Sequence, residues 1–177
     1  MGETAHVLIR REIPADLATV RALTVATSHK PHLEDSVEAR LRDALRSSEA
    51  WIPALSLVAE GEAGELVGHA LCSWGRIGAV RVPDFSLLGV LPAHRRRGVG
   101  SALVHAALAA LDALDTPLVV VLGDRDFYDR FGFRPSTDFG IVGPEPGWGD
   151  LFQVRTLAAY QPSVHGEFAY PEAFRSS

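Results

Sequence analysis

The stretch that decides the fold is Ser86–Val104, SLLGVLPAHRRRGVGSALV. The apolar run over 86–91 predicts a short strand, and Pro92 begins a turn. Three arginines and two glycines follow, and the apolar spacing after them predicts a helix that ends near Leu114. A glycine-rich turn that opens a helix exposes backbone N–H groups beside the positive end of the helix dipole. The stretch therefore predicts a site for a phosphate-bearing ligand.

The segments around this stretch predict one α/β domain over residues 1–177. Leu118–Leu122 is continuously apolar and suits a buried strand, so it completes a right-handed βαβ unit with the central strand and helix. We expect a mixed, twisted sheet of about six to seven strands flanked by about four helices. The other expected helices are Pro14–Thr27, Ser36–Ser48 and a short one from Asp124 to Gly132; Asp35 and Glu38 have capping-box spacing at the start of the second, and Trp51–Pro53 closes this helical part.

The other expected strands are Val7–Ile9, a hairpin of Leu55–Glu60 and Glu65–Ile77, a short strand at Val80–Val82, and tail strands at Phe139–Val142 and Phe152–Leu157.

Composition narrows the class of protein. The net charge of −5 argues against a general nucleic-acid surface, so the arginine run is a local basic patch. A single cysteine, Cys72, excludes an internal disulfide framework and a multi-cysteine metal site. The first twenty residues carry charges and no long apolar run, so we expect no signal peptide, no membrane partner and a cytoplasmic location.

Three phosphate-binding patterns compete for the glycine turn. A P-loop needs Lys-Ser/Thr after its second glycine, where this chain has Ser101-Ala102. A dinucleotide fingerprint needs a third glycine where this chain has Leu103. The third pattern, Arg/Gln-x-x-Gly-x-Gly/Ala between a strand and a long helix, is matched by residues 95–100, RRRGVG. In this the chain resembles the GNAT superfamily of acyl-CoA-dependent N-acyltransferases.

The resemblance extends over nearly the whole chain. Leu88–Pro92 is similar to the Leu-x-Val-x-Pro strand of the family, and Phe127–Phe133 to its Tyr-x-x-x-Gly-Phe segment. Val121–Asp124, running into that segment, and the tail Tyr170–Phe174 resemble the bacterial YhbS-like group of the family. The resemblance implies acetyl-CoA as co-substrate and no metal.

The family likeness also implies which residues hold acetyl-CoA. Backbone N–H groups from Arg96 to Ser101 would cradle the pyrophosphate, and an arginine side chain would pair with the 3′-phosphate. Main-chain groups of Leu88 and Val90 would bind the pantetheine arm beside the strand. The implied cofactor-binding residues are Leu88, Val90, Arg95, Arg96, Arg97, Gly98, Val99, Gly100 and Ser101.

Acylation of an amine by a thioester needs a neutral amine, a stabilised oxyanion and a proton for the thiolate. Tyr128 falls on the general-acid tyrosine of the family, and the backbone N–H of Val90 or a neighbour is the candidate for the oxyanion. Asp84 is the candidate base, because it lies eleven residues before Arg95, where some family members have a carboxylate base. Other members use only a chain of water molecules. Other candidates to relay a proton are His29, His32 and His69, whereas Cys72 is expected to pack in the hairpin with no acyl-enzyme.

The leading functional hypothesis is an acetyl-CoA-dependent N-acetyltransferase with direct transfer to a small-molecule or peptide amine. The alternative is a non-catalytic acyl-CoA-binding or sensor protein with the same fold. Another acyl group or an O-linked acceptor stays open, as does a homodimer built on the tail strands and Trp148. Acceptor choice is assigned to the loops Ser28–Glu34, Ile77–Asp84 and Gly143–Asp150, and the acidic chain favours a cationic amine.

Overall fold

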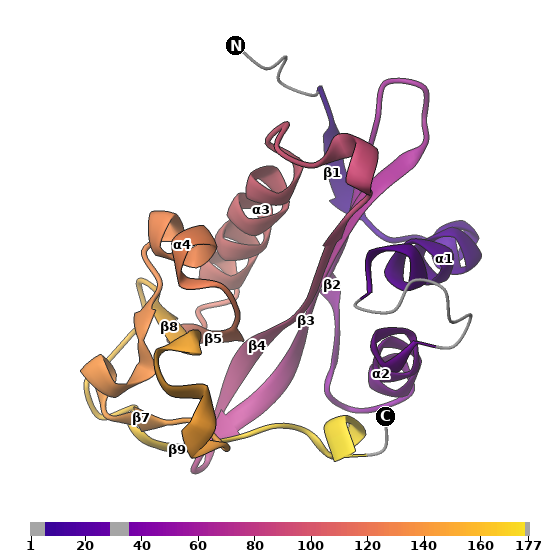
Figure 1. Ribbon diagram of the computed structural model, residues 1–177. Coiled ribbons are helices and arrows are strands. Elements are labelled where there is room, and N and C mark those ends of the chain that lie inside the picture. The colour runs from indigo at the N-terminus through magenta and orange to yellow at the C-terminus, as the bar shows by residue number, and fades with distance from the viewer. Residues whose placement is uncertain (1–5, 29–35, 176–177) are drawn as a thin grey trace.

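Helices cover both faces of a mixed sheet in the computed structural model, which describes residues 6–28 and 36–175 (Figure 1). Within these residues nine strands run in the order β1-β2-β3-β4-β5-β8-β6, and β9 pairs with both β3 and β7. The strands are β1 (Leu8–Arg11), β2 (Trp51–Glu60), β3 (Leu66–Ile77), β4 (Val80–Val90), β5 (Leu118–Leu122), β6 (Arg134–Pro135), β7 (Ile141–Val142), β8 (Phe152–Thr156) and β9 (Gly166–Ala169). The helices are α1 (Leu17–Thr27), α2 (Val37–Arg46), α3 (Val99–Ala113) and α4 (Arg125–Tyr128).

The hairpin of β3 and β4 forms the middle of the sheet. Its antiparallel register runs from Gly68 opposite Val90 to Ile77 opposite Val80. The prediction of a short strand at Val80–Val82, separate from the central strand, is wrong, because β4 is continuous through Pro83. A proline removes only one hydrogen-bond donor from the ladder, and the pairing with β3 before and after Pro83 keeps the segment extended.

The predicted βαβ unit is confirmed in its parallel pairing. β4 and β5 run parallel with Asp84 in register with Val120, and α3 connects them. Helices α3 and α4 lie on one face of the sheet, whereas α1 and α2 lie on the other (Figure 1). Val99, Leu103 and Leu111 of α3 are almost completely buried against the sheet, which explains the apolar spacing of that segment.

The remaining differences from prediction lie where local sequence patterns are weak. Trp51 begins β2 instead of closing the helical part, and β9 was not predicted. Asp35 lies outside the described residues, and Ser36 caps α2 by accepting a hydrogen bond from the Ala39 N–H at 3.1 Å. The α/β class with a mixed sheet is confirmed. The sheet has two more strands than the predicted maximum, because β6, β7 and β9 have only two to four residues each and are too short to give a clear sequence pattern.

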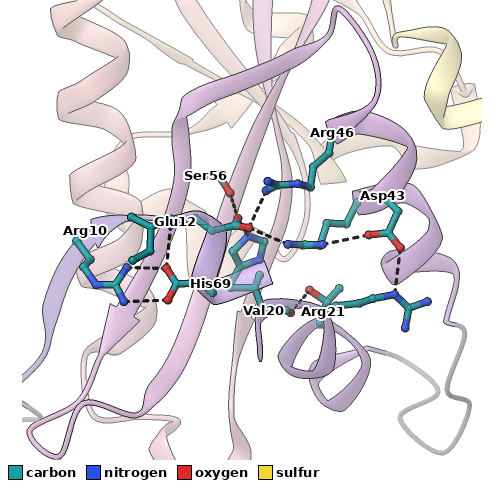
Figure 2. A network of polar contacts seen from close by, with 12 residues as sticks. Arg10, Glu12, Val20, Arg21, Asp43, Arg46, Ser56 and His69 are labelled. Carbon is teal, nitrogen blue, oxygen red and sulfur yellow. Dashed lines mark hydrogen bonds and ion pairs between the residues drawn. The ribbon is translucent and has the colours of Figure 1, made fainter. Parts of the chain in front are cut away.

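A buried ion network fastens α2 to the sheet (Figure 2). The carboxylate of Glu12 accepts hydrogen bonds from Arg42 at 2.8 Å and Arg46 at 2.6 Å, and also from the hydroxyl of Ser56 on β2. The side chains of Glu12 and Arg42 are each only 2% exposed. Removal of either partner would leave a buried charge, so the network fixes α2 against β2 and β3.

Candidate active site

The strands β4 and β5 separate just where the predicted site begins. They are in register only at Asp84 and Val120 among the described residues, so the β5-facing edge of β4 has no strand partner from Phe85 to Val90. The β3–β4 register also shifts between Leu71 and Cys72, so Ser86 is a bulged residue with no residue opposite it in the ladder, although its hydroxyl is hydrogen-bonded to that of Ser73 on β3 at 2.7 Å. An unpaired edge can bind an extended ligand through main-chain hydrogen bonds, and bulges re-aim side chains beside active sites.

A groove of about 640 Å³ joins this free strand edge to the start of α3. Gly98 adopts the left-handed conformation (φ 86°) that turns the chain into the helix, and no side chain caps the helix. The first intrahelical hydrogen bond runs from the Ala102 N–H to the Gly98 carbonyl at 2.9 Å. The N–H groups from Val99 to Ser101 are therefore left to bind an anionic group.

Most of the predicted cofactor-binding residues meet at this groove. Leu88 and Val90 line it from β4, and Arg95, Arg96, Gly98, Gly100 and Ser101 line it from the turn. Arg97 and Val99 do not line it, and the Val99 side chain is buried in the core beside Leu103. The guanidinium of Arg95 donates through Nε to the Val90 carbonyl at 3.0 Å, so this arginine bridges the turn and the strand.

Four further residues line the groove and were not predicted: Thr27, Gly89, Phe127 and Arg130. Arg130 stacks on Phe127, with its guanidinium carbon 4.7 Å from the ring centroid, and donates to the Phe127 carbonyl at 2.9 Å. Both residues belong to the family-like Phe127–Phe133 segment, which is the one sequence signal that could have indicated them. Thr27 has no such signal, because only tertiary packing brings the end of α1 to β4.

A smaller cavity of about 250 Å³, which we call the acid cavity, adjoins the groove and contains Tyr128. The two share Thr27, Leu88 and Gly89 in their walls, so a ligand in the groove can reach Tyr128. Ser86, His69 and Glu38 also line the acid cavity.

Tyr128 is held by the α4 segment and by a set of rings. Asp124 caps α4, as predicted, by accepting hydrogen bonds from the N–H groups of Asp126 at 2.7 Å and Phe127 at 3.3 Å. The Tyr128 ring contacts Phe127 edge-on at a centroid distance of 4.9 Å. Burial raises the pKa of Tyr128 above its ordinary value, with a smaller contribution from the Asp84 carboxylate. The phenol therefore stays protonated at neutral pH and can act as an acid.

Asp84 is buried and lines neither the groove nor the acid cavity. Burial raises the pKa of its carboxyl to about 7, and hydrogen bonding from Ser86 and Tyr170 opposes this rise. Ser86 lines the acid cavity, and its hydroxyl donates to the backbone carbonyl of Asp84 at 3.3 Å, so Asp84 lies directly behind a wall residue of that cavity. A carboxyl with this pKa can accept a proton near neutral pH.

The other residues considered for proton relay or covalent chemistry are His69, Cys72, His29 and His32. Burial lowers the pKa of His69 to about 3, with help from the charges of Arg42 and Arg46, so its ring is neutral. Burial also raises the pKa of the Cys72 thiol, which packs in the core as predicted. His29 and His32 lie outside the described residues, as does most of the loop Ser28–Glu34.

Neither a metal cluster nor a membrane-spanning helix is found in residues 6–28 and 36–175. No group of three or more His, Cys, Asp or Glu side chains there could hold a metal ion. None of the helices in these residues is both long and apolar enough to cross a bilayer.

The fold is that of an α/β protein, and its groove between two diverging strands has the shape and the free N–H groups that suit an extended, phosphate-bearing ligand. Residues 53–135 match the model of the acetyltransferase (GNAT) domain. The chain is also 32% identical over 156 residues to YhbS of Escherichia coli strain K12, an uncharacterised N-acetyltransferase, covering 85% of this chain and 87% of that protein. The chain therefore belongs to the GNAT family of acetyltransferases, so the predicted resemblance and the assignment to the acyltransferases are confirmed.

Two solved structures show the same architecture with ligands. The crystal structure of E. coli YhbS in complex with CoA superposes with a TM-score of 0.85 at 28% identity, covering 99% of this chain and 95% of that one. A GNAT family acetyltransferase from Brucella melitensis in complex with acetyl-CoA gives a TM-score of 0.74 at 31% identity, covering 96% and 99%. The predicted co-substrate, acetyl-CoA, agrees with the ligands held by these two relatives.

Proposed function

We propose that this chain is an N-acetyltransferase that moves an acetyl group from acetyl-CoA directly to an amine, with both held in one ternary complex and Tyr128 as the general acid. One observation carries the proposal. The unpaired edge of β4 leads from the free N–H groups at the start of α3 to the acid cavity that contains Tyr128. A thioester arm laid along this edge would bring its reactive end to the phenol.

The binding steps follow from the groove. The N–H groups of Gly100 and Ser101, which line the groove at the helix start, bind the pyrophosphate. Main-chain groups of Leu88 and Val90 bind the amides of the pantetheine arm. Arg96 and Arg130, which both line the groove, supply positive charge for the remaining phosphate.

The chemical steps need an acid, an oxyanion donor and a base. Tyr128 donates its phenolic proton to the departing sulfur as the carbon–sulfur bond breaks and the carbon–nitrogen bond forms. A backbone N–H of β4 at Val90 or a neighbour stabilises the transient oxyanion. Asp84 accepts the proton of the attacking amine by way of the acid cavity, which the neighbouring Ser86 lines.

The test measures free thiol release from acetyl-CoA with a panel of amines. We expect release that depends on the amine, with initial-velocity lines that intersect, as a ternary complex requires. Parallel lines would indicate an acyl-enzyme and contradict direct transfer. Thermal stabilisation by acetyl-CoA without release for any amine would favour the non-catalytic binding protein, and no stabilisation at millimolar acetyl-CoA would contradict both functions.

A further inference from the structure

A third cavity lies next to the acid cavity, on the side of the C-terminal tail. This tail chamber has a volume of about 600 Å³ and is lined by the loop residues Pro144, Glu145 and Trp148 and by tail residues between Glu167 and Arg175. Leu122, at the end of β5, lines both the tail chamber and the acid cavity, and the residue is 40% exposed. The two cavities therefore meet at Leu122, and a chamber of this size accommodates a small molecule.

The walls of the tail chamber are rich in aromatic rings. The ring of Tyr170 contacts three others, with centroid distances of 6.1 Å to Trp148, 5.0 Å to Phe168 and 4.3 Å to Phe174. All four rings line the chamber. Such rings bury apolar bodies, and their faces attract organic cations.

The charges on the chamber walls favour a cation over an anion. Glu145 and Glu167 are exposed, and neither carboxylate makes an ion pair or hydrogen bond with another of the described residues. Arg175 is the only cation among the described lining residues. Two carboxylates near one guanidinium attract an ammonium group and repel a carboxylate.

The chamber is also connected to the proposed base. Tyr170 lines the chamber, and its phenol lies close enough to the carboxyl of Asp84 for each group to shift the pKa of the other. Asp84 in turn interacts with Ser86, which lines the acid cavity. Asp84 thus lies beside one wall residue of each cavity.

From these observations we infer that the tail chamber is the acceptor subsite, and that it takes amines with an aromatic or apolar body and no carboxylate. The body packs among Trp148, Tyr170 and Phe174, and its amine passes Leu122 into the acid cavity. This inference rests on the proposed acetyltransferase function. It assigns acceptor selection to the C-terminal tail, beyond the loops predicted from the sequence.

The test compares three probes: 2-phenylethylamine, phenylalanine, which adds a carboxylate to the same ring and amine, and ethylamine, which lacks the ring. We expect kcat/KM for 2-phenylethylamine to exceed that for either of the others by at least about 10-fold, since about 1.4 kcal/mol of differential binding is tenfold. Equal rates with phenylalanine would contradict the charge argument, and equal rates with ethylamine would contradict the aromatic argument.

Variants locate the selectivity. We expect the double variant Glu145→Gln/Glu167→Gln and the variant Trp148→Ala each to raise KM for 2-phenylethylamine about 10-fold, with KM for acetyl-CoA unchanged. Glu172→Gln is the matched control, because Glu172 lies on the same tail but lines a different groove, with Trp74. Changes no larger than those of the control would overturn the assignment.

A binding measurement separates this inference from the proposed function. Calorimetry of 2-phenylethylamine with the full chain saturated with CoA should give a Kd that weakens in the same two variants. Binding that follows this pattern without turnover of any amine would support the chamber while contradicting the acetyltransferase. Absence of binding to the wild type would overturn the chamber itself.

Discussion

The ring of Tyr128 packs against the backbone of Gly123 so closely that a methyl group added at position 123 would lie 2.5 Å from Cε2 of the tyrosine. Gly123 itself is fixed by hydrogen bonds: its N–H donates to the Leu151 carbonyl at 3.0 Å, and its carbonyl accepts from Gln153 Nε2 at 3.0 Å. The backbone cannot retreat easily, so the missing side chain at position 123 sets the place of the proposed acid.

Gly123→Ala is therefore expected to displace Tyr128. We expect a loss of about 1–3 kcal/mol in the free energy of unfolding from overpacking, and a fall in kcat of at least about 10-fold with little change in KM for acetyl-CoA. Gly147→Ala is the control, because a Cβ at Gly147 would meet no atom within 4 Å. A Gly123→Ala enzyme with wild-type kcat would show that the position of Tyr128 is not critical.

The turn before α3 gives a prediction about acetyl-CoA. Gly98 has φ 86° and Gly64, in the β2–β3 turn, has φ 82°, so alanine at either position carries a similar backbone cost of about 1–2 kcal/mol. Only Gly98→Ala is expected to weaken acetyl-CoA binding, by about 10-fold, because it distorts the N–H groups at the helix start. Titration with acetyl-CoA distinguishes the two, and equal affinity in both variants would contradict the pyrophosphate assignment.

Asp84 gives a prediction about pH. A base must be deprotonated to act, so kcat at saturating acceptor should rise as the pH increases through about 7 and then level off. The raised pKa of Tyr128 keeps the acid protonated well above this range, so no alkaline decline is expected below its ordinary value of about 10. In Asp84→Asn the rise near pH 7 should disappear and kcat should fall about 100-fold.

The same residue links activity to stability. Its folded pKa of about 7 lies above the unfolded value near 3.8, so the folded protein favours the protonated form. Wild-type stability is therefore expected to fall as the pH rises from about 4 to about 7 and then to stay constant. Asp84→Asn avoids this loss and should be more stable than wild type at pH 8, by about 1–3 kcal/mol. A destabilised asparagine variant at pH 8 would contradict the raised pKa.

The buried network at α2 predicts a large, local stability effect. Glu12→Gln leaves the guanidinium of Arg42 buried without its main carboxylate partner, so we expect a loss of about 3–5 kcal/mol in the free energy of unfolding. Asp150→Asn is the control, because the Arg125–Asp150 pair at 3.0 Å is half exposed and should contribute less than about 1 kcal/mol. Denaturant unfolding measures both, and similar losses in the two variants would show that burial does not strengthen the network's effect.

Much of the fold could be predicted because its signals are local. The glycine turn at Gly98, the cap at Asp124 and the left-handed end at Gly132 each follow from the conformational preferences of one or two residues. The apolar spacing of α3 and the β-branched run of β5 are equally local. These features were enough to predict the βαβ unit and the glycine turn that opens α3.

The rest depends on tertiary packing that the sequence does not reveal. Thr27 reaches the groove because Gly89 lets α1 approach β4, where an added Cβ would lie 2.3 Å from the threonine hydroxyl. Tyr170 reaches Asp84 because β9, a strand of four residues without a periodic pattern, pairs with β3. Such long-range contacts decide which side chains surround a site, and no spacing along the chain encodes them.

The central claim is that Tyr128 delivers the proton in acetyl transfer to an amine. The most direct measurement compares amine-dependent thiol release by Tyr128→Phe with acetyl-CoA binding to the same sample. Tyr160→Phe is the control, because Tyr160 packs beside Phe139 and lines neither the groove nor the acid cavity. We expect Tyr128→Phe to bind acetyl-CoA with wild-type affinity and to lose about 100-fold or more in kcat, while the control keeps both. Wild-type kcat in Tyr128→Phe would contradict the account.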